Sequence, residues 1–242
     1  MRNFGLIGKN IAYSFSKNYF EQKFAVENID ANYQNFDLDQ IDDIKKIILN
    51  QKLNGVNITI PYKEKILAHL DSIDEEAFKI GAVNTVKVVG QKLLGYNTDC
   101  LGFMKSLFPL LEKQHQNALV LGTGGAAKAV THALNSLGID YKSVSRQPKE
   151  YQFSYEEINE EILHDHPLII NCTPLGTAPN IDDAPPIPYQ YLNQQHLLYD
   201  LVYNPPLTTF LANGKKQGCK LSNGHKMLEY QAEQAWKIWN NH

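Results

Sequence analysis

A lysine comes shortly after two alternating polar residues in the sequence Asn57-Ile58-Thr59-Ile60-Pro61-Tyr62-Lys63. In a strand, side chains two positions apart lie on the same face, so Asn57 and Thr59 would point the same way. Proline is tolerated at the first position of a helix, which predicts a short helix that begins at Pro61 and holds Lys63 in its first turn. A helix dipole disfavours a positive charge at that end, so we expect a lysine that can pass a proton. By residue type alone, a solvent-exposed lysine is the commoner outcome.

A carboxylate that could partner this lysine is Asp99, in the sequence Asn97-Thr98-Asp99. Asp99 precedes an expected helix over residues 101–111, and aspartate is a favoured N-cap. It could instead pair with Lys63 and accept a hydrogen bond from a ligand hydroxyl. The local sequence leaves both roles open.

Two serines, Ser14 and Ser16, stand before an expected helix over residues 17–28. Ser16 is the expected N-cap of that helix. Because the N-terminus of a helix also attracts anions, the two hydroxyls suit a ligand carboxylate. Capping and ligand binding are both open roles for them.

The candidate binding groups are mostly neutral hydrogen-bonding side chains: Ser14, Ser16, Asn57, Thr59, Asn84 and Gln231. One cation and one carboxylate accompany them. Such a set suits a small polyhydroxylated acid better than a phosphate or a large apolar ligand. Gln231 lies off the apolar stripe of the expected last helix, and by itself it would be predicted at the surface.

A glycine-rich turn follows an apolar run at residues 118–121, which reads as a buried parallel strand. Gly122, Gly124 and Ala127 fit the pattern G-x-G-x-x-A, and residues 126–137 are an expected helix. In this pattern the first glycine makes the bend, the second lets the backbone approach a pyrophosphate, and the third small residue lets helix and strand pack. Such turns also occur as plain connections, but the flanking strand and helix favour a dinucleotide site.

The next expected strand, over residues 140–145, helps to choose the cofactor. Arg146 follows it, about 20 residues after the last glycine, where the ribose-reading residue of such a unit lies. Lys149 is close behind. Two cations without a carboxylate favour the 2′-phosphate of NADP over the 2′-hydroxyl of NAD. Alternatively, Arg146 and Lys149 are solvated surface cations without a role in binding.

Strands that alternate with helices predict an α/β protein of two domains. The first is an α/β domain with a mixed sheet over residues 1–100, joined by a C-terminal helix within residues 225–242, and the second is a Rossmann-like dinucleotide-binding domain over residues 101–224. The last helix has an apolar stripe, so we expect it to pack on the first domain. The other expected elements are strands at 3–8, 33–36 and 53–60, a hairpin of 83–89 with 92–96, strands at 168–171 and 197–200, and a surface loop at 177–188.

Composition narrows the class of protein. The chain has 242 residues with a formal net charge of −3, which gives no indication of nucleic-acid or membrane-surface binding. Its three cysteines have no paired spacing, which argues against a disulfide scaffold or a zinc site. Neither a signal peptide nor an apolar run that could span a bilayer is evident, so we expect a cytoplasmic protein without a metal.

Together and in order, these motifs resemble the shikimate dehydrogenase family over nearly the whole chain. The matching segments are 14–16, 57–63, 81–85, 97–99, 122–126, 171–176, 199–203 and 224–228, with Gln231. The resemblance implies a dehydrogenase that reduces 3-dehydroshikimate to shikimate with NADPH, in the biosynthesis of chorismate and the aromatic amino acids. It also implies small-molecule ligands as the partners of a monomer or homodimer, with no nucleic acid and no membrane.

The resemblance implies a role for each matching residue. Lys63 and Asp99 would be the catalytic pair. The substrate would be bound by Ser14 and Ser16 at its carboxylate, by Asn57, Thr59, Asn84 and Gln231 at its hydroxyls, and by Tyr203 near the nicotinamide. NADP would be bound by Gly122, Thr123, Gly124, Gly125, Ala126, Ser145, Arg146, Thr173 and Gly224.

The chain departs from the family pattern in places. Tyr13 and Lys17 stand where the family usually has histidine and proline around the two serines, and Ser145-Arg146-Gln147 replaces the usual Asn-Arg-Thr. Three alternatives remain: an NAD-dependent quinate/shikimate dehydrogenase, a non-catalytic sensor of shikimate-like ligands, and an enzyme like methylene-tetrahydrofolate dehydrogenase. The serine loop and Asn84 fit the third poorly, and a sensor has no need of the Lys63 and Asp99 pair.

Overall fold

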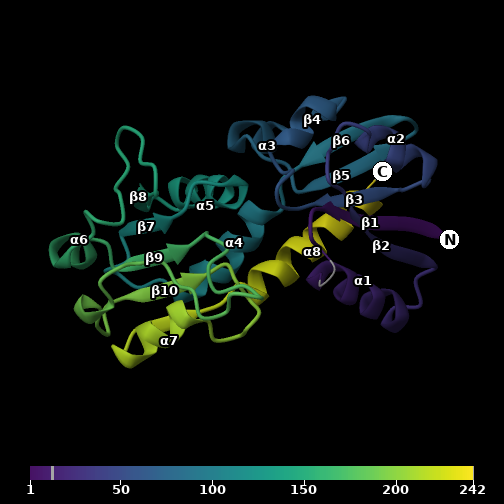
Figure 1. Cartoon of the computed structure of the whole chain (residues 1–242). Coiled ribbons are helices and arrows are strands. Elements are labelled where there is room, and N and C mark those ends of the chain that lie inside the picture. The colour runs from purple at the N-terminus through teal and green to yellow at the C-terminus, as the bar shows by residue number, and fades with distance from the viewer. Residues whose placement is uncertain (12–13, 242) are drawn as a thin grey trace. The chain divides into compact units, whose positions relative to one another are not determined.

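The chain forms two compact units, and the computed structural model describes residues 1–11 and 14–241 (Figure 1). Unit 1 comprises Met1–Gly102 and Leu228–His242, and unit 2 comprises Phe103–Met227. Tyr13, which departs from the family pattern, lies outside the described residues. Within the described part of the chain, no helix is both long enough and apolar enough to cross a membrane.

Unit 1 is built on a mixed six-stranded sheet in the order β2-β1-β3-β5-β6-β4. Strand β1 pairs in parallel with β2 and β3, whereas β5 pairs antiparallel with β3 and with β6. The predicted mixed sheet and hairpin are therefore confirmed. The strands are β1 (Arg2–Gly8), β2 (Ala31–Asp37), β3 (Gly55–Ile58), β4 (Ser72–Ile73), β5 (Thr85–Val89) and β6 (Lys92–Tyr96).

The helices of unit 1 are α1 (Phe15–Val26), α2 (Ile44–Asn50), the 3-10 helix η1 (Lys65–His69) and α3 (Glu75–Ile80), and the chain passes between the units in α4 (Asp99–Leu107) and α8 (His225–Asn240). The prediction of Ser16 as the N-cap of α1 is wrong. Ser14 is the cap, because its backbone is extended and its side chain accepts a hydrogen bond from the Lys17 N–H. Ser16 lies inside the first turn and is buried.

The predicted helix at Pro61 is also wrong. The Tyr62 N–H donates to the Thr59 carbonyl at 2.8 Å, which closes a turn around the proline, and η1 begins only at Lys65. Lys63 therefore lies in the turn before a short 3-10 helix, and the expected effect of a helix dipole on its charge does not apply. The position of Lys63 is instead held by its carbonyl, which accepts from the Val83 N–H at 2.8 Å.

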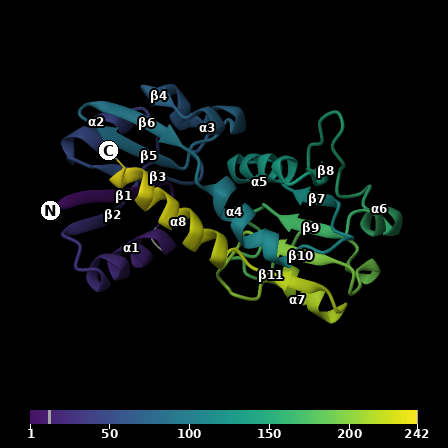
Figure 2. The ribbon, with the colours of Figure 1, turned by 180° about the vertical axis from the view of Figure 1, so that it is seen from behind.

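Helix α8 covers strands β1 and β3 beside α1, as Figures 1 and 2 show. Trp239 stacks on Phe4, with 4.8 Å between ring centroids, and its indole N–H donates to the Val86 carbonyl at 3.0 Å. Ala232 and Ala235 are fully buried in the same cluster. The prediction that the last helix packs on the first domain is confirmed.

Unit 2 is a parallel five-stranded sheet in the order β11-β10-β9-β7-β8. Strands β9 and β10 have the predicted bounds, and all of their residues are buried. Short apolar runs predicted them well because parallel strands are buried on both faces. The strands are β7 (Asn117–Leu121), β8 (Asp140–Val144), β9 (Leu168–Asn171), β10 (Leu197–Asp200) and β11 (Lys220–Ser222). The helices are η2 (Phe108–Leu110), α5 (Gly125–Ser136), α6 (Glu160–Asp165), η3 (Tyr189–Tyr191) and α7 (Thr209–Lys216).

Numbered within unit 2, the strand order is 2-1-3-4-5, a doubly wound arrangement in which the connection from β7 to β8 and the connection from β9 to β10 lead in opposite directions. In such sheets ligands bind outside the carboxyl ends of the strands at the point where the direction reverses. That point lies between β7 and β9. The fold alone therefore indicates where unit 2 would bind a ligand.

A buried carboxylate ties together the loops after β9 and β10. Asp200 accepts at Oδ1 from Asn171 Nδ2 (2.9 Å) and from the Val202 N–H (3.0 Å), and at Oδ2 from Thr208 Oγ1 (2.5 Å). Asn171 in turn accepts from the N–H and the hydroxyl of Thr173. Burial raises the pKa of Asp200 to about 6, although these hydrogen bonds oppose the shift.

The first prediction concerns the pH dependence of stability. Because the pKa of Asp200 is higher in the folded state than its ordinary value of 3.8, this group contributes stability below pH ~4 that is lost as the pH rises through ~6. Asp200→Asn keeps the acceptor at Oδ1, can donate to Thr208, and carries no charge. The free energy of unfolding of the variant, relative to that of the wild type, should therefore rise by about 2–3 kcal/mol between pH 4 and pH 7.

Denaturant unfolding at each pH, followed by circular dichroism, measures this difference. Asp182→Asn, at an exposed position in the same unit, controls for the loss of one charge. A difference between Asp200→Asn and wild type that stays constant from pH 4 to pH 7 would contradict the raised pKa.

Candidate functional site

Lys63 and Asp99 form an ion pair, with 2.6 Å between Nζ and Oδ2. Their side chains are 16% and 6% exposed. Of the two roles that the sequence left open for Asp99, the structure has the pairing: Asp99 is the first residue of α4, and the amide oxygen of Asn97 accepts from the Cys100 N–H at 3.1 Å at that helix end. The lysine head is thus held at the edge of the protein interior with one acidic neighbour.

Three of the predicted binding residues join in one buried hydrogen-bond network in unit 1. Asn57 donates to Thr85 Oγ1 (3.2 Å) and to the carbonyl of Asn84 (3.3 Å). The Asn84 side chain donates to Thr98 Oγ1 (2.9 Å) and to Gln231 Oε1 (3.4 Å), and it accepts from the Thr98 N–H (2.7 Å). Neutral amides and hydroxyls from β3, β5, α8 and the segment before α4 therefore meet at one place.

The burial of Gln231 differs most clearly from what the local sequence predicts. By itself it was predicted at the surface, yet it is only 4% exposed. Its partners, Asn84 and Thr98, are more than 130 residues away in sequence. A periodicity argument cannot find a polar partner that the fold brings from so far, so the prediction failed for that reason.

The remaining substrate-side candidates lie at the ends of nearby elements. Thr59 is half-buried one residue beyond β3, and its N–H donates to the Ile7 carbonyl at 2.9 Å. Ser14 caps α1, whereas Ser16 is buried in the first turn beside the Tyr33 hydroxyl. The described hydrogen bond of Ser14 is local, and that of Thr59 ties the end of β3 to β1, so neither joins the network of Asn57, Asn84 and Gln231.

The glycine turn of unit 2 leaves a helix N-terminus accessible at the carboxyl end of β7. Gly122 has φ +103°, in the left-handed region that favours glycine. Gly124 is the N-cap of α5 and is exposed, and a Cβ added there would meet nothing within 4 Å. Thr123 is exposed as well, while Gly125 and Ala126 begin α5 half-buried. Free N–H groups with open space above a glycine fit a pyrophosphate.

Three further cofactor candidates surround this turn or follow the neighbouring strand. A Cβ added at Gly122 would lie 3.1 Å from Thr173 Cγ2, so Thr173 borders the turn from the end of β9. Arg146 is exposed just beyond β8, where the carboxyl end of that strand adjoins β7. Ser145 precedes it, and its hydroxyl accepts from the Gln147 N–H at 3.2 Å. An exposed guanidinium here fits a phosphate on the ribose.

Tyr203 and Gly224 lie near the loop after β10. Tyr203 is half-buried and follows Val202, whose N–H is held by Asp200. Gly224 is buried against the backbone of Leu201, and a side chain at this position would collide with that carbonyl. Glycine is therefore required at 224 by close packing within unit 2.

Sequence reasoning missed three members of the network. Thr85 and Thr98 belong to the matching segments 81–85 and 97–99 but have no predicted role, and Tyr33 begins the predicted strand at 33–36. Tyr33 is 1% exposed, and its hydroxyl donates to Asn57 Oδ1 at 2.8 Å. The available signal was its type, since a tyrosine in a core strand needs a partner for its hydroxyl.

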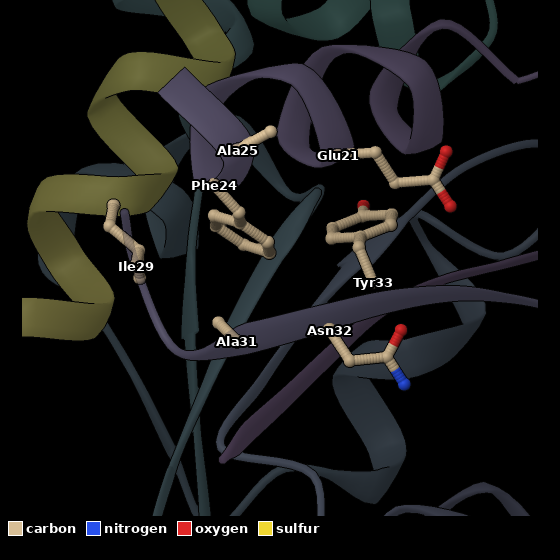
Figure 3. A pocket seen from close by; sticks show the side chains of 7 residues that line it. All are labelled: Glu21, Phe24, Ala25, Ile29, Ala31, Asn32 and Tyr33. Carbon is tan, nitrogen blue, oxygen red and sulfur yellow. The ribbon is translucent and has the colours of Figure 1, made fainter. Parts of the chain in front are cut away.

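Two hollows lie in unit 1, and Tyr33 of the hydrogen-bond network borders one of them. The first, of about 280 Å³, is bordered by α1 and β2, and Figure 3 shows Glu21, Phe24 and Tyr33 along it. The second, of about 480 Å³, lies between the end of α2 and the turn at Gly90. Their linings contain neither Lys63 nor Asp99, so the ion pair borders neither hollow.

Known proteins that resemble the chain point to one family. The model of the shikimate dehydrogenase substrate binding domain matches residues 6–86. A shikimate dehydrogenase (NADP(+)) of Clostridium botulinum is 41% identical over 246 aligned residues, which cover 97% of this chain and 95% of the relative.

Solved structures agree with this assignment. Shikimate dehydrogenase 1 of Peptoclostridium difficile superimposes with a TM-score of 0.88 at 36% identity, covering 99% of this chain and 91% of that one. The Thermus thermophilus shikimate 5-dehydrogenase, solved in complex with NADP(H) and shikimate, gives a TM-score of 0.88 at 31% identity, with 99% and 94% covered. With relatives this similar over almost its entire length, the chain belongs to the shikimate dehydrogenase family.

Proposed function

We propose that the chain is an NADP-dependent shikimate dehydrogenase, an oxidoreductase that reversibly reduces 3-dehydroshikimate to shikimate. The observation that carries the proposal is the Lys63–Asp99 pair, with 2.6 Å between Nζ and Oδ2, in a member of a family whose relatives bear that name. A proton donor held by a carboxylate is what the reduction of a ketone to an alcohol needs from the protein. The neutral amides of Asn57, Asn84 and Gln231 suit the hydroxyls of such a substrate.

The residues of unit 1 would carry the proton chemistry. NADPH, when bound, supplies the hydride that reaches the ring ketone carbon. Lys63 Nζ donates a proton to the ketone oxygen as negative charge develops there, and while charged it stabilises that oxygen. Asp99 orients the ammonium group and can accept a hydrogen bond from a substrate hydroxyl. In the oxidation of shikimate, Lys63 takes up the hydroxyl proton.

Substrate binding would be divided among the other candidate residues. Ser14 and Ser16, at the N-terminus of α1, would hold the carboxylate through their hydroxyls. Asn57, Thr59, Asn84 and Gln231 would bind the ring hydroxyls, and Tyr203 would be the substrate-binding residue near the nicotinamide. An uncharged set of donors and acceptors fixes orientation through directional hydrogen bonds, which favours a polyhydroxylated ring.

NADP would be held by unit 2. The turn from Gly122 to Ala126 would bind the pyrophosphate, with Thr173 and Gly224 shaping its surroundings. Arg146, with Ser145 beside it, would pair with the 2′-phosphate, because a guanidinium binds phosphate oxygens in a bidentate manner. The residues present therefore fit the dinucleotide that the family uses.

The general test of the proposal is a steady-state assay of the wild type with shikimate and quinate, each with NADP⁺ and NAD⁺, followed by nicotinamide absorbance. We expect the highest kcat/KM with shikimate and NADP⁺. Comparable turnover of quinate with NAD⁺ would identify a quinate/shikimate dehydrogenase instead. Binding of shikimate without turnover of either acid would identify a sensor.

Removal of the proton donor should act on the chemical step. Lys63→Met should lower kcat by about 10²–10⁴-fold, because general acid catalysis contributes that much. The KM for shikimate should change little, since the amides and serines still bind it. Lys65→Met, two residues on and exposed, is the matched control and should keep wild-type kinetics. A kcat near the wild-type value in Lys63→Met would refute the role of Lys63.

Removal of the guanidinium at 146 should act on cofactor choice. Arg146→Ala should raise the KM for NADP⁺ about 10- to 100-fold, the value of a charge-assisted hydrogen bond of about 1.5–3 kcal/mol. The KM for NAD⁺ and the KM for shikimate should stay close to wild type. Lys149→Ala tests the neighbouring cation in the same assay. If Arg146→Ala changed the KM for NADP⁺ and the KM for NAD⁺ equally, Arg146 would not recognise the 2′-phosphate.

A further inference from the structure

Tyr33 is a fully buried residue whose ring packs in the apolar core, whereas its hydroxyl lies among polar side chains. Figure 3 shows it rising from β2 toward α1, beside Phe24. Its ring stacks on Phe20, with 4.8 Å between centroids and 15° between planes, and the residue is 1% exposed. A hydroxyl taken this far from water must find its partners inside the protein.

The hydroxyl of Tyr33 reaches a proposed substrate-binding side chain that comes from another strand. It donates to Asn57 Oδ1, on β3, at 2.8 Å. Burial raises the pKa of Tyr33 well above its ordinary value, and the Ser16 side chain, in the first turn of α1, opposes the rise. Tyr33 therefore stays protonated, and a donor, throughout the working pH range.

The bond from Tyr33 fixes which way the Asn57 amide points. The other end of this amide, Nδ2, faces the Asn84 carbonyl at 3.3 Å and Thr85 Oγ1 at 3.2 Å. A carbonyl can only accept, so the NH₂ group must lie on that side and the oxygen on the side of Tyr33. Without the Tyr33 hydroxyl, Asn57 Oδ1 would lose its described donor, and the amide would lose one of the two constraints on its orientation.

We propose that Tyr33 is a positioning residue for substrate binding, which acts by holding the Asn57 amide in the orientation that receives the hydroxylated acid. It touches no reacting atom itself. The inference rests on the proposed function, and it extends the site to a residue on β2. Loss of the hydroxyl should weaken substrate binding while the hydride and proton transfers proceed as before.

The chain offers a matched control in Tyr62. This residue is 2% exposed and belongs to the same unit, and its hydroxyl donates to the Leu38 carbonyl at 2.6 Å. Tyr33→Phe and Tyr62→Phe each remove one buried hydroxyl that donates one described hydrogen bond. Both should lower the melting temperature, so stability alone does not distinguish positioning from support of the fold.

Steady-state kinetics distinguish the two roles. Tyr33→Phe should raise the KM for shikimate about 5- to 20-fold, in the range expected for one misplaced hydrogen-bonding group. Its kcat and its KM for NADP⁺ should stay within about threefold of wild type. Tyr62→Phe should keep all three constants. Equal KM values for shikimate in the two variants would overturn the proposal and leave the proposed function intact, whereas absence of turnover in the wild type would overturn the proposed function and this role with it.

A double-mutant cycle shows whether Tyr33 acts through Asn57. If it does, Tyr33→Phe should raise the KM for shikimate less when it is introduced into Asn57→Ala than into wild type, because contacting residues are not additive. Independent, multiplicative effects on KM would count against the proposal. Should Tyr33→Phe fail to fold, Thr85→Val removes a partner from the other end of the same amide. It too should raise the KM for shikimate, and an unchanged KM there would overturn the proposal.

Discussion

The Lys63–Asp99 ion pair is an interaction that several elements of unit 1 must be correctly placed to form. Two charged groups that are this little exposed lose hydration, which costs free energy. Their mutual attraction offsets that cost only when the geometry of the pair is held firmly. Here the turn after β3 holds one partner, through the bond from the Val83 N–H, and the first residue of α4 holds the other. The antiparallel hairpin of β5 and β6 leads the chain into α4, so the mixed sheet is what brings the carboxylate to the lysine.

Around this pair, the polar groups of unit 1 are almost all satisfied by one another. Asn57, Asn84, Thr98 and Gln231 exchange hydrogen bonds in a buried network. Satisfied networks of this kind have few alternative arrangements, because every change of orientation leaves a buried group without a partner. A substrate hydroxyl would therefore meet side chains whose direction is set beforehand, which reduces the entropy lost on binding.

Patterns that extend over a whole element predicted the fold well. The apolar runs at β9 and β10 gave the bounds of those strands, and the glycine turn between β7 and α5 lies where the pattern placed it. Signals that depend on one residue failed where tertiary context decides. Pro61 lies in a turn closed by Thr59 and Tyr62, so no helix begins there. Ser14, and not Ser16, is the N-cap of α1, because the helix begins two residues earlier than expected.

Gln231 shows why part of the site is beyond local prediction. Its helix is placed by Trp239, which stacks on Phe4 and donates to the Val86 carbonyl on β5. The same β5 begins at Thr85, next to Asn84, so the hydrophobic contact that seats the end of α8 also delivers Gln231 to its partners two turns earlier in the helix. A burial pattern can find Trp239 by its apolar stripe, but the glutamine acquires its role only once that helix has docked.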